Sequence, residues 1–343
     1  MYTKKLGQAI EKELATLKEA GKFKVERELE GAQGAEVEIG GKKVLMFASN
    51  NYLGLATETI HKTLEKKLAQ FLGVEDSILY STNFMSNLGF FATITNEAFG
   101  EEREHIDAIY SDELNHASII DAFKLCKKES VIKRIYPHGD VVALEKMLEY
   151  DQKDTSKNYR FKIIVTDGVF SMEGYLAELP KLKELSEKYE ALLFVDDAHA
   201  VGVLGKTGAG TPEHFGLQGK IDVLSGTFGK ALGGAVGGYI AGKKEIIELL
   251  RQKSRTYLFS NSVPPSVVMA SIRALELLEE KPELLNKVRE NSEYFRTEVF
   301  LWSGFGFRSC RKAQHGYVSR FPPRIPKSRS TGRLRYSEKW GRK

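Results

Sequence analysis

With 343 residues, of which 42% are hydrophobic and 28% charged, the chain has the composition of a globular protein with one large domain and a smaller appendage. No apolar run approaches the roughly 18 residues that cross a bilayer. The two cysteines lie far apart, which excludes a disulfide framework or a cysteine-rich metal site and favours the cytoplasm. The net charge of +5 comes from residues 300–343, because residues 1–299 hold 39 basic and 45 acidic residues.

Residues 1–45 are expected to form an N-terminal helical arm. Leu6, Ile10, Leu14 and Leu17 recur at helical spacing, which predicts an amphipathic helix. The stretch has no apolar signal core and is rich in glutamate, so neither a secretory signal nor a transit peptide is expected.

Between about Ser77 and Gly242, short apolar or β-branched runs alternate with helical stretches such as LPKLKELSEKYE. Alternation of this kind, with strands apolar on both faces, favours an α/β fold with a mostly parallel sheet. The runs are SILY, AIYSD, VIKRIY, FKIIVTDG, ALLFVDD, IDVLSGTF and VGGYIAG. They fall within a predicted large domain at residues 46–282.

The chain changes character towards its C-terminus. PPSVVMASIRALELLEE predicts a long helix opened by proline, and another helix is expected from near Leu284. Residues 283–299 would begin a smaller domain. Residues 300–343 have no helical or strand periodicity and fit either a basic nucleic-acid tail or a disordered or frame-shifted end. We expect the latter, and so no nucleic-acid partner.

Polar side chains follow three of the predicted strands. Ser171 lies just beyond one strand, Asp196 ends the next with His199 three residues on, and Thr227 and Lys230 follow a third. In a parallel sheet these strand ends meet at one edge, where ligands bind. A pyridinium ring needs a carboxylate at its nitrogen, a lysine for a Schiff base, and a hydroxyl with backbone amides for a phosphate. The pattern therefore indicates pyridoxal 5′-phosphate (PLP).

Each residue also has a structural interpretation: Asp196 could cap a helix, His199 could be a structural hydrogen-bonding residue, and Lys230 could be solvated. A second functional interpretation is a nucleoside-triphosphate loop, because AVGVLGKT (Ala200–Thr207) nearly fits G-x-x-x-x-G-K-[ST]. Ala200 replaces the first glycine, however, and irregular sequence with a proline follows where a helix should begin. No G-x-S-x-G elbow or H-E-x-x-H pattern occurs. The PLP site is the better interpretation, and no metal is expected.

Six motifs in chain order resemble the α-oxoamine synthases, fold-type I PLP enzymes that condense an amino acid with an acyl-CoA. The resemblance runs from about Lys42 to Val299, and together the motifs are highly specific. They are FASNNYLGLA, SDELNHASIIDA, TDGVFSMEG, FVDDAHAVGVLG, GTFGKALGGAVGGYIAG and RTYLFSNSVPPS. The resemblance implies a large domain with a mostly parallel seven-stranded sheet. It also implies a small C-terminal domain, of which this chain would carry a truncated start.

The family's site residues carry over position by position. The resemblance implies that Lys230 bonds to the cofactor and then removes the substrate α-proton, that Asp196 pairs with the pyridine nitrogen, and that His116 stacks on the ring and contacts substrate. The remaining implied contacts are His199 to the ring 3-oxygen, Ser171 to the cofactor, Asn83, Phe84 and Thr227 to the phosphate, Asn50 to the substrate carboxylate, and Ser260 and Asn261 to the phosphate of the other subunit.

GTFGKALGGAVGGY with YLFSNS is most similar to the family's glycine C-acetyltransferase branch, which converts glycine and acetyl-CoA to 2-amino-3-oxobutanoate and CoA. The 8-amino-7-oxononanoate synthase branch shares most of the other motifs. An inactive PLP-binding chain is a further alternative, because the family's carboxylate-clamping arginine belongs to the small domain. The resemblance thus implies a cytoplasmic homodimeric acyltransferase acting on glycine and an acyl-CoA, with no membrane partner.

Overall fold

The computed structural model describes residues 4–26, 36–45, 60–96, 99, 105–233 and 235–295. Asn50, one of the predicted site residues, lies outside the described residues, as does the basic stretch 300–343. Among the described residues no helix is both long enough and apolar enough to cross a membrane.

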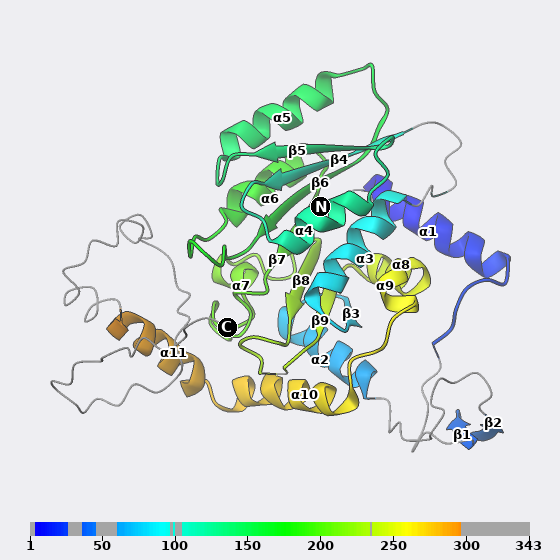
Figure 1. Ribbon diagram of the computed structural model, residues 1–343, viewed down its shortest axis with the longest axis vertical. Coiled ribbons are helices and arrows are strands. Elements are labelled where there is room, and N and C mark those ends of the chain that lie inside the picture. The colour runs from blue at the N-terminus through cyan, green and yellow to red at the C-terminus, as the bar shows by residue number, and fades with distance from the viewer. Residues whose placement is uncertain are drawn as a thin grey trace, which may run out of the picture.

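A seven-stranded sheet forms the centre of the molecule (Figure 1), in the order β3-β9-β8-β7-β6-β4-β5. Each of the seven predicted runs is a strand, and neighbouring strands are parallel except where β9 pairs with β3 and β8. The predicted mostly parallel α/β fold is therefore confirmed. The strands are β3 (Asp76–Tyr80), β4 (Ile106–Asp112), β5 (Val131–Tyr136), β6 (Tyr159–Asp167), β7 (Leu192–Asp196), β8 (Val223–Thr227) and β9 (Gly238–Gly242).

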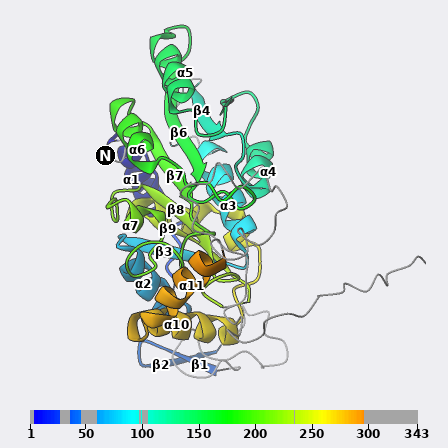
Figure 2. The same ribbon diagram turned by 90° about the vertical axis from the view of Figure 1, so that its left-hand side faces the viewer.

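Helices cover both faces of this sheet, and Figure 2 shows α6 and α4 on opposite sides of β6 and β7. One face carries α2 (His61–Leu72), α5 (Val141–Lys153), α6 (Leu179–Lys188) and α10 (Pro265–Glu280). The other carries α1 (Lys4–Glu19), α3 (Asn83–Asn96), α4 (Ala117–Leu125) and α8 (Lys244–Lys253), with the short α9 (Arg255–Leu258) beside α3. The short α7 (Thr211–His214) lies between β7 and β8 in the chain.

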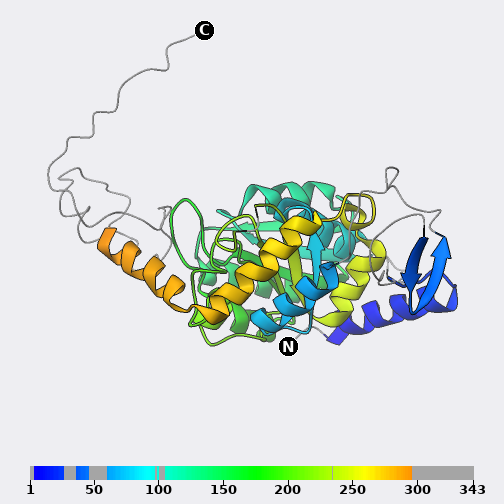
Figure 3. The same ribbon diagram turned by 90° about the horizontal axis from the view of Figure 1, so that it is seen from below.

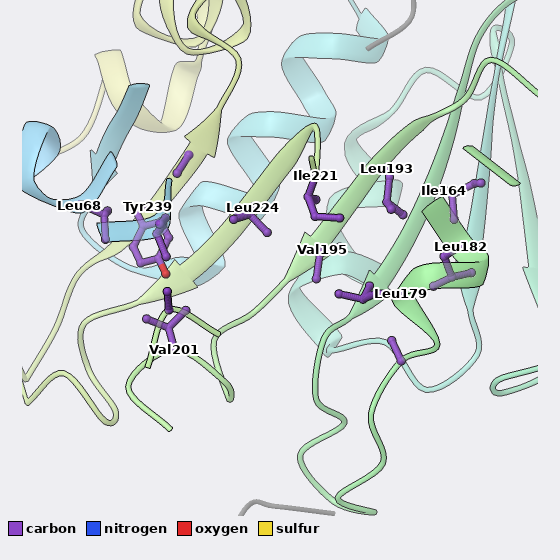
Figure 4. Packing of buried hydrophobic residues seen from close by; sticks show 14 of the residues in the cluster. Leu68, Ile164, Leu179, Leu182, Leu193, Val195, Val201, Ile221, Leu224 and Tyr239 are labelled. Atoms are coloured by element: carbon purple, nitrogen blue, oxygen red, sulfur yellow. The ribbon is translucent and has the colours of Figure 1, made fainter. Parts of the chain in front are cut away.

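A hydrophobic core lies on each face of the sheet, and the alternation of side chains along the strands explains both. Ile163 and Leu192 face α1, α3 and α4, whereas their successors Ile164 and Leu193 face α5 and α6. Successive side chains of a strand point to opposite faces of the sheet, so a strand that is apolar at every position is buried on both faces. Figure 4 shows the second of these cores, to which the sheet contributes Leu193 and Val195 and α6 contributes Leu179 and Leu182.

The predicted N-terminal helix exists as α1, and it packs against α8. Leu6, Ile10 and Leu14 are buried in the core beneath it, as their spacing predicts. A two-stranded hairpin follows, β1 (Glu36–Ile39) and β2 (Lys42–Leu45), whose Gly40-Gly41 turn has positive φ at both residues.

The last described helix, α11 (Glu283–Tyr294), begins one residue before the predicted start near Leu284. It follows α10 and extends beyond the edge of the sheet (Figure 3). Leu285 is buried, and Arg289 donates a hydrogen bond to the carbonyl of Gly205. This helix therefore contacts the chain that follows β7.

Candidate active site

Two acidic side chains end adjacent parallel strands at the carboxyl edge of the sheet. Asp167 of β6 pairs in register with Asp196 of β7, which in turn pairs with Ser225 of β8. Both carboxyl groups belong to residues that are only 4% exposed. The edge therefore holds two nearly buried acids side by side, at the place where ligands gather in such sheets.

A cavity of about 180 Å³ lies at this edge. Its lining comes from the ends of three strands and from the starts of α3 and α4. The lining residues are Asn83, Phe84, His116, Asp167, Asp196, Ala198, His199, Thr227 and Lys230. The structure therefore brings together most of the residues that the sequence predicts for one site, including the amine and the carboxylate on which the PLP interpretation depends.

Lys230 projects from the segment that joins β8 to β9. This segment is closed at its base, because Phe228 donates its amide to the carbonyl of Gly237 at 3.0 Å and the Thr227 hydroxyl donates to the same carbonyl at 2.9 Å. The Lys230 Nζ lies 2.8 Å from Nε2 of His199. Although the Lys230 side chain as a whole is exposed, desolvation of its amine lowers the pKa, and the charges of Asp196 and Asp167 oppose that shift. A lysine of lowered pKa holds more free amine, the form that attacks an aldehyde.

Asp196 accepts more hydrogen bonds from the protein than Asp167, the other acid of the site. Its carboxylate accepts from Nδ2 of Asn83 at 3.1 Å, from Nδ2 of Asn87 at 2.8 Å and from the amide of Ala198 at 3.1 Å. These three donors fix the orientation of the carboxylate in the cavity. Asp196 is thus suited to hold a negative charge against a cationic ring nitrogen.

Asp167 is a cavity residue that the sequence interpretation did not single out. Within the described part of the chain its carboxylate accepts one hydrogen bond, a long one of 3.3 Å from the amide of His116. Burial, followed by repulsion from Asp196, raises the pKa of Asp167 well above its usual range. The signal was present in the sequence, because Asp167 ends the apolar run IIVTD just as Asp196 ends LLFVD.

The starts of two helices complete the cavity. Asn83 and Phe84 are the first residues of α3, and the first amides of a helix have no partner within it and attract anions. His116 is the N-cap of α4, and its ring accepts a hydrogen bond from the amide of Ser118 at 3.2 Å. The hydroxyl of Thr227 accepts from the amide of Gly229 at 3.1 Å. The cavity thus has an anion-binding side and an imidazole wall.

Three other predicted residues do not line this cavity in the single chain. Ser171 lies in the turn after β6, and Ser260 and Asn261 are exposed after α9. The carbonyl of Asn261 accepts a hydrogen bond from the hydroxyl of Ser81, close to the start of α3. Their roles remain predictions.

The nucleoside-triphosphate interpretation of Ala200–Thr207 finds no support. The segment consists of turns and runs on to the four-residue α7 instead of opening a long helix. The amide and hydroxyl of Thr207, which would face a phosphate and its metal, bond to the carboxylate of Glu213 at 3.0 Å.

A larger cavity of about 270 Å³ lies beside β4 and β5 and lacks the chemistry of the first. It contains no lysine among its lining residues. The carboxylate of Asp112, which lines this cavity, is hydrogen-bonded to the amides of Leu114 and Gly139 and to Nδ1 of His138, at 2.9 to 3.0 Å. This acid ties two loops together.

The residues of the smaller cavity fit PLP. Asp196 offers a hydrogen-bonded carboxylate for the ring nitrogen, Lys230 an amine for the aldehyde, and Thr227 a hydroxyl beside the first amides of α3 for the phosphate. His199 would contact the 3-oxygen and His116 would cover the ring. Each group that the cofactor needs is therefore present in one cavity.

Comparison with known proteins agrees with this geometry. The model of the class I and II aminotransferase family matches residues 32–319, which extends past Val299, where the sequence motifs placed the end of the resemblance. The chain is 42% identical to 2-amino-3-ketobutyrate coenzyme A ligase of Escherichia coli, over 91% of this chain and 81% of that protein. It is 41% identical to 8-amino-7-oxononanoate synthase of Thermoanaerobacter pseudethanolicus, over 84% of this chain and 76% of that protein.

Solved structures give the same family. A serine palmitoyltransferase solved with PLP is 26% identical, with a TM-score of 0.62 over 81% of this chain and 72% of that one. The 8-amino-7-oxononanoate synthase of Francisella tularensis is 29% identical, with a TM-score of 0.58 over 74% of this chain and 72% of that one. The chain therefore belongs to the class I and II aminotransferase family and, within it, to the α-oxoamine synthases, acyltransferases whose cofactor is PLP.

Proposed function

We propose that the chain condenses glycine with acetyl-CoA and releases CoA and 2-amino-3-oxobutanoate. The observation that carries this proposal is that Lys230 and Asp196 line one cavity, in a chain 42% identical to a 2-amino-3-ketobutyrate coenzyme A ligase. The 8-amino-7-oxononanoate synthases are similar to nearly the same extent, so an enzyme that accepts a longer acyl chain is the second candidate.

When bound, PLP supplies an aldehyde for the substrate amine and a ring that withdraws electrons from the substrate α-carbon. Lys230 then acts as the base that takes the α-proton of glycine, and its lowered pKa increases the fraction of free amine near neutral pH. The glycine α-carbon forms a bond with the carbonyl carbon of acetyl-CoA, the carbon–sulfur bond breaks, and CoA leaves as the thiol.

Other residues of the cavity orient the reacting groups. Asp196, held by Asn83 and Asn87, keeps a fixed negative charge at the floor of the cavity. His199 directs the Lys230 amine through the 2.8 Å contact between them. Fixing a base within reach of the proton that it removes replaces a bimolecular encounter by an intramolecular one.

The two candidate reactions are separated by a paired assay of the full-length chain with PLP. One arm contains glycine and acetyl-CoA, and the other contains alanine and pimeloyl-CoA, whose carbons make 8-amino-7-oxononanoate once the carboxyl group leaves as CO₂. Thiol release gives the rate and mass spectrometry the product. We expect kcat/KM to be at least about 10-fold higher for the first pair. A preference for pimeloyl-CoA would favour the second candidate, and no CoA release in either arm would overturn both.

We also propose that the enzyme is a homodimer in which Ser260 and Asn261 reach the other subunit's cofactor phosphate. Both residues are exposed in the single chain and absent from its own cavity, which supports a role towards a second copy. Mixing Lys230→Ala and Asn261→Ala subunits tests this, because only a shared site leaves one intact centre in each mixed dimer. We expect about a quarter of the wild-type activity to return. No return would show that Asn261 serves its own subunit.

A further inference from the structure

Two buried polar residues behind the cavity link His116 to Asp196. Asn87 of α3 is 0% exposed and Ser118 of α4 is 1% exposed, and neither lines the cavity. Nδ2 of Asn87 donates to Oδ2 of Asp196 at 2.8 Å and to Oγ of Ser118 at 2.8 Å. Oγ of Ser118 lies 2.8 Å from Nδ1 of His116. The four side chains therefore form one continuous chain of hydrogen bonds.

The direction of each bond follows from which groups can donate. An ionised carboxylate only accepts, so Asn87 must turn its amino group, and not its carbonyl oxygen, towards Asp196. This orientation leaves Oδ1 of Asn87 buried with no hydrogen-bond partner among the residues that the structure describes. A buried acceptor without a hydrogen bond lowers the stability of the fold. The two hydrogen bonds that Nδ2 donates offset this cost. Asn87 is thus a donor to both of its neighbours.

The same reasoning determines the tautomer of His116. Ser118 Oγ accepts from Asn87, so its own proton is available for Nδ1 of His116 at 2.8 Å. The backbone amide of Ser118, which can only donate, points to the same nitrogen at 3.2 Å. Two donors therefore converge on Nδ1, which must carry a lone pair. The proton of the neutral ring then lies on Nε2, on the far side of the imidazole.

We propose that Asn87 and Ser118 are positioning residues that hold His116 in the Nε2–H tautomer. His116 thereby presents an N–H donor, not a lone pair, to an oxygen of the molecule bound in the cavity. The orientation derives from this chain's own contacts, and only the identity of the bound molecule rests on the proposed function. Asp196 sets the direction of these hydrogen bonds through Asn87. It therefore influences the orientation of His116 as well as lining the cavity itself.

Nitrogen NMR of the imidazole tests the proposal directly, because protonated and unprotonated ring nitrogens have well-separated shifts. The full-length chain is labelled with ¹⁵N-histidine and measured before and after PLP is added, and the His116 signals are assigned by their loss in His116→Asn. We expect an unprotonated Nδ1 and a protonated Nε2 in both states. A proton on Nδ1 of the wild-type protein would overturn the proposal. This result does not depend on which acyl-CoA, if any, is a substrate.

Variants test the contribution of Ser118. Ser118→Ala removes one of the two donors, and we expect its His116 shifts to move towards a mixture of tautomers, with Ser118→Thr restoring the wild-type values. In the assay, Ser118→Ala should raise the amino-acid KM by about 10-fold with a smaller change in kcat. Ser271→Ala is the matched control, since this serine is also buried in a helix and, among the described residues, donates its hydroxyl to the carbonyl of Val267 alone. Unchanged His116 shifts in Ser118→Ala would count against the role of its hydroxyl.

Discussion

The amine of Lys230 and the imidazole of His199 are hydrogen-bonded to each other, with Nζ 2.8 Å from Nε2. They come from the ends of neighbouring strands, β7 for the histidine and β8 for the lysine. The same cavity holds Asp196 and Asp167, whose charges act on the lysine amine. The reactive group is therefore held in place by residues from the sheet edge itself.

The Lys230 amine should titrate below the range of an ordinary lysine. Burial lowers its pKa, and the negative charge of Asp196 opposes part of that shift. Reductive ¹³C-methylation, followed by NMR titration before PLP is added, measures this pKa. In Asp196→Asn the pKa should fall further, because an opposing charge has gone. A rise in that variant would contradict the electrostatic account.

Lys230→Ala should abolish both turnover and the covalent attachment of PLP. Loss of the only group proposed as nucleophile and base predicts a decrease in kcat of at least about 10³-fold. The absorbance spectrum of the protein with PLP measures attachment separately from activity. Lys220→Ala, on the turn before β8, is the control and should retain both. A variant at position 230 that kept the wild-type spectrum would remove the covalent role.

The two adjacent acids should respond differently to the same substitution. Asp196 accepts several hydrogen bonds from protein donors, whereas burial and the neighbouring Asp196 raise the pKa of Asp167 well above its usual range. Because its raised pKa disfavours the charged form, Asp167→Asn should change kcat/KM less than Asp196→Asn does, and we expect a value within about 3-fold of wild type. Asp196→Asn should lower it by about 10- to 100-fold. Equal losses in the two variants would contradict this difference between the two acids.

Asp197 should make the folded state less stable as pH rises through the acidic range. Burial raises its pKa to about 7, so between about pH 4 and pH 7 the folded protein binds a proton that the unfolded chain has released. This contribution is complete below pH 4 and is lost by pH 7, with a slope of up to about 1.4 kcal/mol per pH unit. Urea unfolding at pH 5 and pH 7.5 measures it. In Asp197→Asn the free energy of unfolding should decrease less between these two pH values. A decrease equal to that of the wild type would show that Asp197 is not the group responsible.

Gly210 should tolerate no side chain, because it approaches Asp197 closely. Its φ is +98°, and a Cβ there would lie 1.9 Å from Oδ2 of Asp197. Gly210→Ala should destabilise the fold by more than about 2 kcal/mol. Gly21→Ala is the matched control, since Gly21 also has positive φ but no atom of the described residues lies within 4 Å of the new Cβ, and it should cost about 1 kcal/mol. Thermal or urea unfolding compares the two, and similar losses would show that the close approach does not matter.

Much of the fold could be predicted from the sequence, because each strand of the sheet is a short apolar run whose identity does not depend on its neighbours. The direction of β9 could not, since VGGYIAG is equally apolar whichever way it runs. The hairpin of β1 and β2 was missed, although Gly40-Gly41 between two short β-prone runs was a usable signal.

Some residues of the candidate site could likewise be predicted from the sequence, and others could not. Asp196, Thr227 and Lys230 could be found because strand ends of a parallel sheet converge. Asn87 and Ser118 could not, because a polar residue within a helix has no sequence signal that names its partner on another helix. Which helices lie together is determined by packing across the whole domain.

The reversed direction of β9 has a consequence for how this enzyme can diverge. Thr227 and Gly238 face each other in the sheet, so the segment bearing the reactive amine leaves and re-enters it at a single point. Changes at the tip of that segment can therefore re-aim the amine without disturbing the strand pairing beneath. Substitutions in that segment would thus alter the chemistry of the cavity while the pairing of β8 with β9 stays the same.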